Sequence, residues 1–345
     1  MSDSPQFPWS AGSATGIGSM PGDDPAEACR IVFGEVPDLP YLPELPGRGP
    51  GADITGRTAA LLVDLPVQTT PRGWKLTDRP GRDASRAAGY LSRDLDTLEE
   101  TASGYQGPLK IAICGPWTLA ATLELSHSVN PALADPGAVA DLTASLAEGL
   151  AGHAADVRRR VPGASLIVQL DEPALPAALA GHVPTASGLN VVSAIDRAVA
   201  SQRLATVLSA PSAFTVVHCC GRSVPFPEIR SAGASAVSFD LGHLPNAGVD
   251  IVAELADDGM GLFVGALPTS SVERLVSGPP LLPRLTAESV VTLWRRTGLA
   301  PGLLTRQVVI TPACGLAGSS PAAARAALAH CQDAARIAPE MIDPS

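Results

Sequence analysis

One histidine and two cysteines have the types and the spacing of a zinc site. His218 and Cys220 are two residues apart at the end of an apolar, β-branched run, so their side chains point the same way on an extended backbone. Cys314 follows a second apolar run far downstream. Imidazole nitrogen and thiolate sulfur are ligands of zinc, and a catalytic zinc has three protein ligands and one position for a substrate. The three residues therefore predict a zinc ion that leaves room for an incoming thiol.

The other cysteines fit a simpler interpretation. Most free cysteines are small buried hydrophobes, and Cys114 and Cys331 lie in apolar segments that suit this role. Cys220 and Cys314 can be interpreted in the same way, but a histidine at the matching spacing favours a metal. Replacement of Cys219 is not expected to affect metal binding.

Acidic residues follow two further apolar runs. Asp240 ends the run after the one that carries His218, so it is a candidate ligand of the same metal. Asp171 and Glu172 follow an earlier run, and two adjacent acids can hold a substrate ammonium or position a proton acceptor. Acids in this position also stabilise a helix N-terminus through the helix dipole. The residues alone leave both interpretations of Asp171 and Glu172 open.

Short apolar runs alternate with amphipathic segments and predict alternating strands and helices. The expected strands cover residues 15–20, 39–45, 109–114, 165–171, 213–219, 236–241, 261–267 and 307–311. The expected helices cover residues 84–103, 136–160, 190–208, 247–258, 287–296 and 321–336. Two of these helices begin with a polar cap followed by proline, at Asp135 and Ser320.

This order predicts an α/β fold with a single TIM (β/α)8 barrel over residues 1–345, with residues 1–12 flexible. Residues 46–80 form a long ordered excursion after the second strand. The main alternative is a doubly wound open sheet, which usually carries a GxGxxG fingerprint after its first strand. The stretch GIGSMP at 16–21 does not match that fingerprint. The barrel is favoured because the candidate site residues follow strands, where barrel enzymes assemble their sites.

Composition and charge argue against several classes of protein. The 345 residues carry a formal net charge of −10, which disfavours a sequence-independent grip on nucleic acid. No apolar run approaches the roughly 20 residues that span a bilayer, and the first residues lack the blocks of a secretory signal. Six cysteines are too few for a disulfide scaffold of this size. We therefore expect a cytoplasmic protein that binds neither a membrane nor nucleic acid.

In combination, these motifs resemble the C-terminal catalytic barrel of the cobalamin-independent methionine synthase family, within the superfamily that includes uroporphyrinogen decarboxylase. The similarity runs nearly end to end, from IGSMP at 17–21 to CGL at 314–316. In that family an HxC pair, an acid on the next strand and a late cysteine bind zinc. The resemblance therefore implies that Zn²⁺ is bound by four residues, with an aspartate where the family has glutamate: His218, Cys220, Asp240 and Cys314.

The resemblance also implies roles around the substrate. Asp171 would contact the amino group of homocysteine, Ser19 would lie beside its carboxylate, and Glu44 would be a second partner of the ammonium. Glu172 would be an acid close to the methyl donor, where it could protonate a folate leaving group. Family members with a folate donor carry a second barrel, whereas single-barrel relatives related to uroporphyrinogen decarboxylase include zinc thiol methyltransferases that take the methyl group from a methylated corrinoid. The expected donor is therefore a folate or a methylated corrinoid, which a partner protein can carry.

The implied function is zinc-dependent methyl transfer to a small-molecule thiol, with homocysteine as the acceptor and methionine as the product. Bound zinc would convert the thiol to a nucleophilic thiolate. The alternatives are a corrinoid-dependent or other alkyl-thiol transferase with a different acceptor, and a metal-free barrel similar to uroporphyrinogen decarboxylase. A further alternative is a non-catalytic, zinc-stabilised partner of a larger methyltransferase, because structural zinc sites are closed by four protein ligands.

Overall fold

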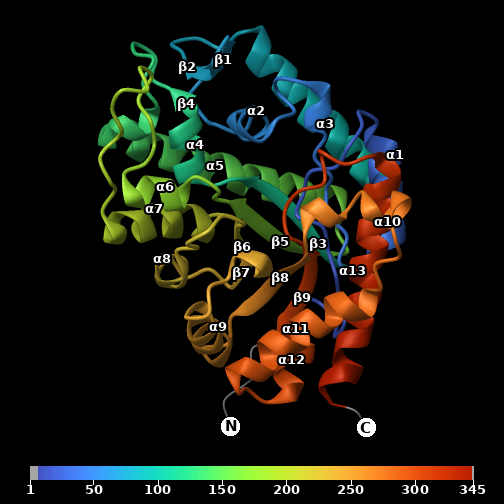
Figure 1. Ribbon diagram of the computed structural model, residues 1–345. Coiled ribbons are helices and arrows are strands. Elements are labelled where there is room, and N and C mark those ends of the chain that lie inside the picture. Colours follow the sequence, from blue (N-terminus) through green and yellow to red (C-terminus); the bar gives the residue numbers. More distant parts are fainter. Residues whose placement is uncertain (1–6, 344–345) are drawn as a thin grey trace.

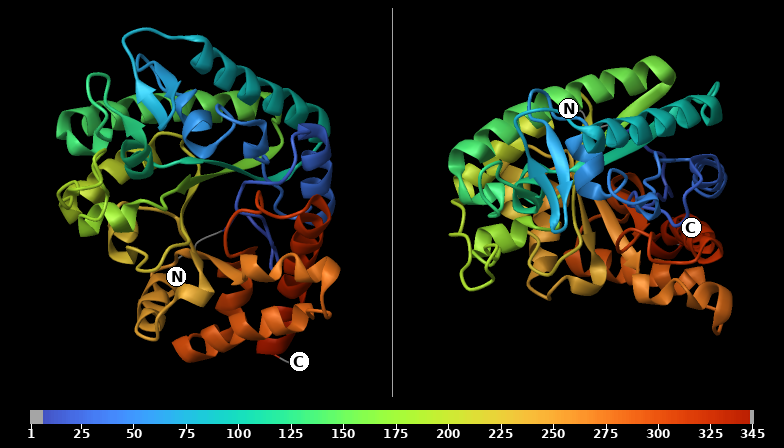
Figure 2. Two further views of the ribbon diagram at one scale, coloured as in Figure 1. Left: turned by 45° about the horizontal axis from the view of Figure 1, so that its top comes forward. Right: turned by 90° about the horizontal axis from the view of Figure 1, so that it is seen from above.

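Six parallel strands form the main sheet of the protein, whose computed structural model describes residues 7–343 (Figure 1). In spatial order they are β3 (Gly107–Cys114), β5 (Ala164–Asp171), β6 (Phe214–Cys219), β7 (Ala236–Asp240), β8 (Gly261–Leu267) and β9 (Val308–Pro312). The sheet is curled into a half-barrel, with helices on its outer side (Figure 2). The sequence predicts all six strands to within two residues, because each is an apolar run that is buried on both faces.

Two further segments predicted as strands, 15–20 and 39–45, pair only through isolated parallel bridges. Ala14 pairs with Ile310 of β9, and Tyr41 pairs with Lys110 of β3. A third bridge joins the two segments to each other. Pro40 interrupts the second segment, and a proline has no N–H to donate to a ladder of hydrogen bonds. The prediction of two full strands is therefore not confirmed here, although both segments lie along the edges of the sheet.

The helices that flank the sheet lie where the sequence predicts them, although one starts seven residues later than predicted, one starts four residues earlier and the last ends six residues later. They are α3 (Arg82–Thr101), α5 (Pro136–Arg160), α7 (Arg197–Ser209), α9 (Gly248–Asp257), α11 (Pro283–Thr297) and α13 (Pro321–Ile342). The predicted helix at 190–208 was wrong at its beginning, because Asp196 caps α7 and Val191 instead pairs with Pro184 in a loop.

Seven shorter helices were not predicted from sequence. They are α1 (Pro25–Glu35), α2 (Ile54–Ala59), α4 (Pro116–Thr122), α6 (Leu175–Ala180), α8 (Phe226–Ser231), α10 (Arg274–Ser277) and α12 (Pro301–Gln307). Single 3-10 turns cover Pro46–Arg48, Ala132–Ala134, Leu241–His243 and Thr269–Ser271.

The excursion after the second extended segment is ordered and covers one end of the main sheet. It contains α2 and the antiparallel strands β1 (Val67–Thr70) and β2 (Gly73–Leu76), which β4 (Leu123–Glu124) extends to three strands. Thr58 of α2 accepts the backbone N–H of Cys114 over 2.8 Å. The excursion therefore lies over the carboxyl end of β3, beside α4 (Figure 1).

Two separate apolar clusters pack on the two sides of the main sheet. The larger one lies between the sheet and its helices. The smaller one fills the concave side and joins Trp9 and Leu39 to one residue from each of five strands: Ile167, Val216, Ala236, Phe263 and Val309. Trp9 packs edge-on against Phe263, with ring centroids 5.1 Å apart. Of the segment predicted to be flexible, residues 1–6 lie outside the described residues, and Trp9 is buried.

Alternation along the strands fixes which side chains lie above the smaller cluster. Because successive side chains of a strand point to opposite faces, Gln169 and Asp171 lie on the same concave face as Ile167. By the same rule, His218 shares this face with Val216. Polar groups therefore gather at the carboxyl ends of the strands, above an apolar base.

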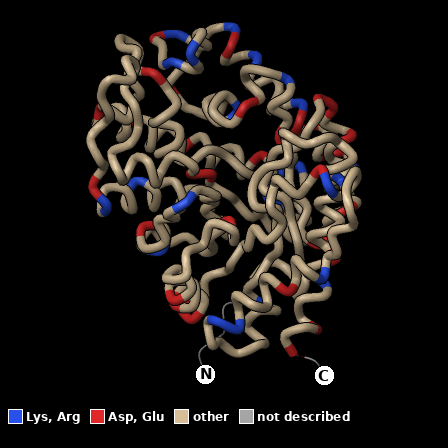
Figure 3. The backbone as a smooth tube through the Cα atoms, viewed as in Figure 1, with Lys and Arg blue, Asp and Glu red and all other residues tan. Residues whose placement is uncertain are grey.

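Charged residues are distributed over the outer elements, with Lys and Arg interspersed among Asp and Glu (Figure 3). Across residues 7–343, no helix combines the length and the apolar character needed to cross a membrane.

Candidate metal and substrate site

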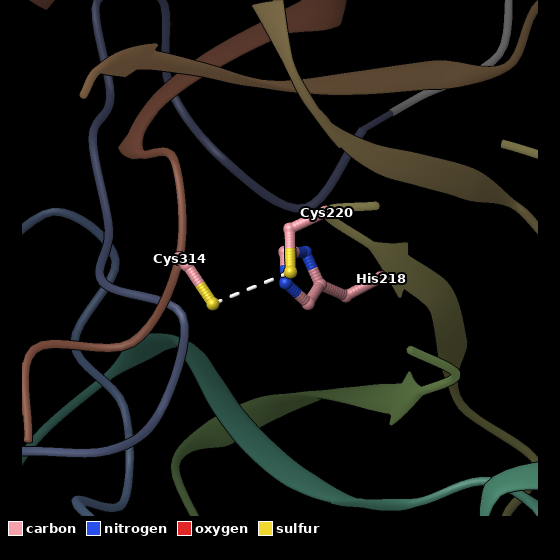
Figure 4. A group of neighbouring side chains, drawn as sticks. All are labelled: His218, Cys220 and Cys314. Carbon is pink, nitrogen blue, oxygen red and sulfur yellow. Dashed lines mark hydrogen bonds between the residues drawn. The ribbon is translucent and has the colours of Figure 1, made fainter. Parts of the chain in front are cut away.

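His218, Cys220 and Cys314 meet at the carboxyl ends of β6 and β9 (Figure 4). Their candidate ligand atoms all lie within 4.8 Å of one another, and the two sulfur atoms are 3.3 Å apart. His218 is only 3% exposed, and the two cysteines are partly buried. Among the described residues, this is the one group of at least three His, Cys, Asp or Glu side chains close enough to share a metal ion.

The His218 ring presents one nitrogen to the two sulfur atoms. Nδ1 lies 2.8 Å from Oγ of Ser238 on β7, whereas Nε2 is buried without a hydrogen-bond partner in the described chain. A buried polar atom without a partner is costly. A metal ion bound to Nε2 would remove that cost, and the contact with Ser238 is the kind of support that orients a metal-binding histidine.

The pKa values of the two thiols are shifted in opposite directions. The hydrogen bond between them lowers the pKa of Cys314, and the nearby His218 ring adds to this effect. The same hydrogen bond, with burial, raises the pKa of Cys220 well above its ordinary value. A metal bound by both sulfur atoms would displace the protons that they carry.

This donor set fits zinc. One imidazole and two sulfur atoms are among its preferred ligands, and two thiolates on a tetrahedral zinc lie about 3.7 Å apart. The observed separation of 3.3 Å is close to that value. Three ligands would leave the fourth position for another sulfur.

Asp240 does not join this group in the structure. Its Oδ1 accepts the N–H of Gly242 over 2.7 Å, and its Oδ2 lies 3.2 Å from Nδ1 of His243. The same His243 nitrogen lies 3.1 Å from the carbonyl oxygen of Cys220. Asp240 therefore orders the backbone that follows β6 and β7 beside the thiol pair.

Asp171 lies next to the histidine and cysteine group. It ends β5, pairs in register with His218 on β6 and is 6% exposed. Its Oδ1 accepts Nε2–H of Gln169 over 2.7 Å, and Oδ2 accepts no hydrogen bond from the described residues. Burial raises the pKa of Asp171, while the neighbouring His218 lowers it. A ligand ammonium beside Oδ2 would favour the carboxylate.

Glu172 turns away from this cluster and binds α4. Its Oε1 accepts the N–H of Trp117 over 3.0 Å, and its Oε2 accepts both the N–H and the hydroxyl of Thr118 over 2.7 Å. The side chain is wholly buried, and burial raises its pKa to about 7 despite these hydrogen bonds. The arrangement matches the helix-terminus alternative, although the helix is α4 rather than the segment after Glu172 itself.

Ser19 and Glu44 come together on the two bridged segments. Ser19 pairs with Glu44, and the N–H of Met20 donates to the Glu44 carbonyl over 2.8 Å. Burial raises the pKa of Glu44 to about 7, whereas Arg57, with Nε 4.0 Å from its Oε1, lowers it. Ser19 remains partly exposed, whereas Glu44 is buried.

Three buried polar residues around this site were missed from sequence. Lys110 and Gln169 lie inside apolar strands, and Arg57 lies in α2 with Nη1 2.7 Å from Asp94. The signal available for the first two was a long polar residue within an otherwise apolar run. For Arg57 we find no comparable signal in the sequence.

Comparisons with known proteins identify one family for this chain. The family described as "Cobalamin-independent synthase, Catalytic domain" matches residues 131–337. That match includes Asp171, His218, Cys220 and Cys314, whereas Ser19 and Glu44 precede it. No match was found among curated proteins.

Two solved structures illustrate how distant the structural likeness is. One is a B12-independent methionine synthase from Shewanella sp. W3-18-1 in complex with selenomethionine, which is 14% identical, with a TM-score of 0.60 over 98% of this chain and 99% of that chain. The other is the carboxyl transferase domain of Rhizobium etli pyruvate carboxylase, which is 13% identical, with a TM-score of 0.27 over 99% of this chain and 56% of that chain. The first shares the fold, and the second is too dissimilar to support any argument.

The family match covers more than half of the chain and includes the strands that carry the histidine and cysteine group. The protein therefore belongs to the cobalamin-independent methionine synthase catalytic-domain family, a family of methyltransferases.

Proposed function

We propose that this protein is a zinc-dependent methyltransferase that transfers a methyl group to the sulfur of homocysteine and forms methionine. The observation that carries the proposal is the pairing of two features on adjacent strands. His218, Cys220 and Cys314 suit a metal that takes a thiol, and the open Oδ2 of Asp171 beside them suits an ammonium. Homocysteine has both groups, separated by a short carbon chain.

The residues have distinct roles in this proposal. When bound, zinc would lower the pKa of a coordinated thiol, so that the attacking sulfur is a thiolate at neutral pH. Ser238 holds the His218 ring with Nε2 toward the sulfur atoms. Asp171 and Glu44 bind the ammonium and Ser19 binds the carboxylate, which fixes the direction in which the sulfur faces.

Asp240 takes a supporting role in the proposal rather than that of a ligand. Both of its oxygens already contact Gly242 and His243. Three ligands leave the coordination position that a catalytic zinc needs, whereas four would close the site. This arrangement argues against the non-catalytic, zinc-stabilised alternative.

The methyl donor in this proposal is a methylated corrinoid rather than a folate. A folate leaving group needs a proton, and Glu172 was the candidate acid for that step. Its two oxygens are occupied by the N-terminus of α4 and by Thr118. A corrinoid leaving group takes up no proton. A site in which Glu172 binds α4 and cannot donate a proton therefore favours a corrinoid donor over a folate.

The proposal also includes a closed eight-stranded barrel and a cytoplasmic location. The segments at 15–20 and 39–45 would be its first and second strands, which their bridges to β9, to β3 and to each other support. Residues 1–345 would then form one catalytic unit. Six free cysteines support a reducing compartment.

Three measurements on protein purified without chelators test this function. Metal analysis should give one zinc per chain, and X-ray absorption should show an added sulfur ligand when homocysteine is supplied. Methylcobalamin and methyltetrahydrofolate are then offered in parallel, and we expect methionine from the first. Zinc that gains no sulfur would refute the catalytic role, and methionine formed from the folate alone would refute the proposed donor.

A further inference from the structure

Lys110 is a buried cation in the middle of β3. It is 0% exposed, and its Nζ donates to the carbonyl of Ile17 over 2.6 Å and to Oε1 of Gln169 over 2.9 Å. Nζ also lies 5.1 Å from the centroid of the Tyr41 ring, over its face. Burial lowers the pKa of Lys110 to about 8, and the acids Asp171 and Glu44 oppose that shift. Burial of a charged ammonium costs free energy, so the position of Lys110 inside the sheet calls for an explanation.

The ammonium fixes the orientation of the Gln169 amide. Oε1 faces Lys110, and Nε2 donates to Oδ1 of Asp171 over 2.7 Å and to the Ile17 carbonyl over 2.9 Å. In the flipped orientation, the NH₂ group would face an ammonium, and Oε1 would face a carboxylate and a carbonyl. A neutral partner in place of Lys110 would lose much of this preference.

Lys110 and Gln169 together contact the two parts of the proposed amino-acid subsite, the turn that carries Ser19 and the carboxylate of Asp171. The Ile17 carbonyl receives hydrogen bonds from Lys110 and from Gln169, and Ser19 follows two residues later. Asp171 receives one hydrogen bond from Gln169, which keeps Oδ1 occupied and leaves Oδ2 open. The turn that carries Ser19 and the carboxylate of Asp171 are therefore set relative to each other by Lys110 and Gln169.

We propose that Lys110 and Gln169 are positioning residues that make the site selective for thiols bearing an α-amino-acid head group. They do not touch the substrate. They orient Asp171 toward the ammonium and the Ser19 turn toward the carboxylate. This inference rests on the proposed function and adds the residues that determine its substrate class.

The test compares two thiols on the zinc-loaded protein by isothermal titration calorimetry. Homocysteine carries the amino group, and 4-mercaptobutyrate is the same molecule without it. The variants are Lys110→Met with Gln169→Met, which removes both polar partners together, and Gln169→Met alone, in case the double variant does not fold. The matched control is Gln307→Met, because Gln307 is also buried but donates to the Ala256 carbonyl away from the site.

We expect the wild-type protein to prefer homocysteine, and both test variants to lose about tenfold or more in homocysteine affinity, the effect of about one buried hydrogen bond to a charged group. Zinc content should stay unchanged, and affinity for 4-mercaptobutyrate, which keeps the carboxylate but lacks the ammonium, should fall less than affinity for homocysteine. Every property of Gln307→Met should stay unchanged. Equal weakening of both thiols, or unchanged homocysteine binding, would overturn the inference. A wild-type protein that holds zinc and binds neither thiol would instead refute the proposed function itself.

Discussion

Ser19 and Gly315 are in contact so close that Gly315 has no room for a side chain. A Cβ atom on Gly315 would lie 2.1 Å from Oγ of Ser19. The N–H of Leu316 donates to the Ser19 carbonyl over 2.9 Å, so the turn after Cys314 and the turn at Ser19 are joined. The Ser19 turn and the turn after Cys314 are thus parts of one packed unit.

Gly315→Ala should therefore damage substrate binding. The new methyl group forces the Ser19 hydroxyl to rotate away from its present position, and we expect the KM for homocysteine to rise at least about tenfold. Steady-state kinetics measure this. The control is Gly318→Ala, where a Cβ meets nothing within 4 Å. An unchanged KM in Gly315→Ala would show that the position of Ser19 does not matter to the substrate.

Replacement of the thiol ligands should remove both metal and turnover. We expect Cys220→Ser and Cys314→Ser to lose zinc and to slow turnover more than about a hundredfold, because a hydroxyl is a poor zinc ligand. Cys219→Ser is the matched control, because its wholly buried side chain lies outside the ligand group. Metal analysis and methionine formation are measured together. Full zinc content in both ligand variants would contradict the assignment.

The variant Asp240→Ala tests whether Asp240 binds the metal or only supports the backbone beside it. If three residues bind the metal, the variant keeps its zinc and loses only the contacts to Gly242 and His243. We expect zinc content near one per chain and a turnover that is reduced less than in Cys220→Ser. Competition with a coloured chelator measures the affinity. Release of zinc as easily as from Cys220→Ser would identify Asp240 as a fourth ligand.

The burial of His153 predicts that the folded protein loses stability in weak acid. His153 lies buried in α5 with Nε2 unpartnered, and burial lowers its pKa from 6.5 to about 4. Because the unfolded chain takes up the proton first, the stability that neutral His153 contributes is complete above pH 6.5 and is lost as the pH falls toward 4. Relative to His153→Leu, the wild-type protein should lose about 3 kcal/mol across this window.

Urea unfolding between neutral pH and pH 4 measures this difference. His127→Leu is the matched control, because His127 is exposed, and its stability should follow the wild type at every pH. Parallel curves for the wild type and His153→Leu would contradict the prediction.

The strands of the main sheet were predictable because burial on both faces leaves continuous apolar runs with clear ends. The start of α5 was predictable from Asp135 and Pro136, and α1 carries the same signal at Asp24 and Pro25, which sequence interpretation did not use. The bridged segments could not be defined so well. Their pairing depends on tertiary contacts at the edges of the sheet rather than on a local pattern.

The meeting of His218 and Cys314 was predictable, because parallel strands present their carboxyl ends at one edge. The role of Glu172 could not be assigned, since its neighbours on α4 come from a distant part of the chain. Lys110 and Gln169 were overlooked for a related reason. Their hydrogen-bond partners depend on which strands are adjacent in the sheet, and the sequence of one strand does not show which residues its neighbours place opposite a polar side chain.

The edge-on aromatic rings at the base of the curled sheet bear on how reactants would reach the site. Trp9 packs against Phe214 and Phe263 and belongs to the apolar cluster on the concave side, so that end is stoppered. In the proposed function, both reactants would therefore enter and leave at the opposite end, where the carboxyl ends of the strands lie. A small thiol would bind before a bulkier methyl donor covers it, which predicts an ordered rather than a random sequence of binding.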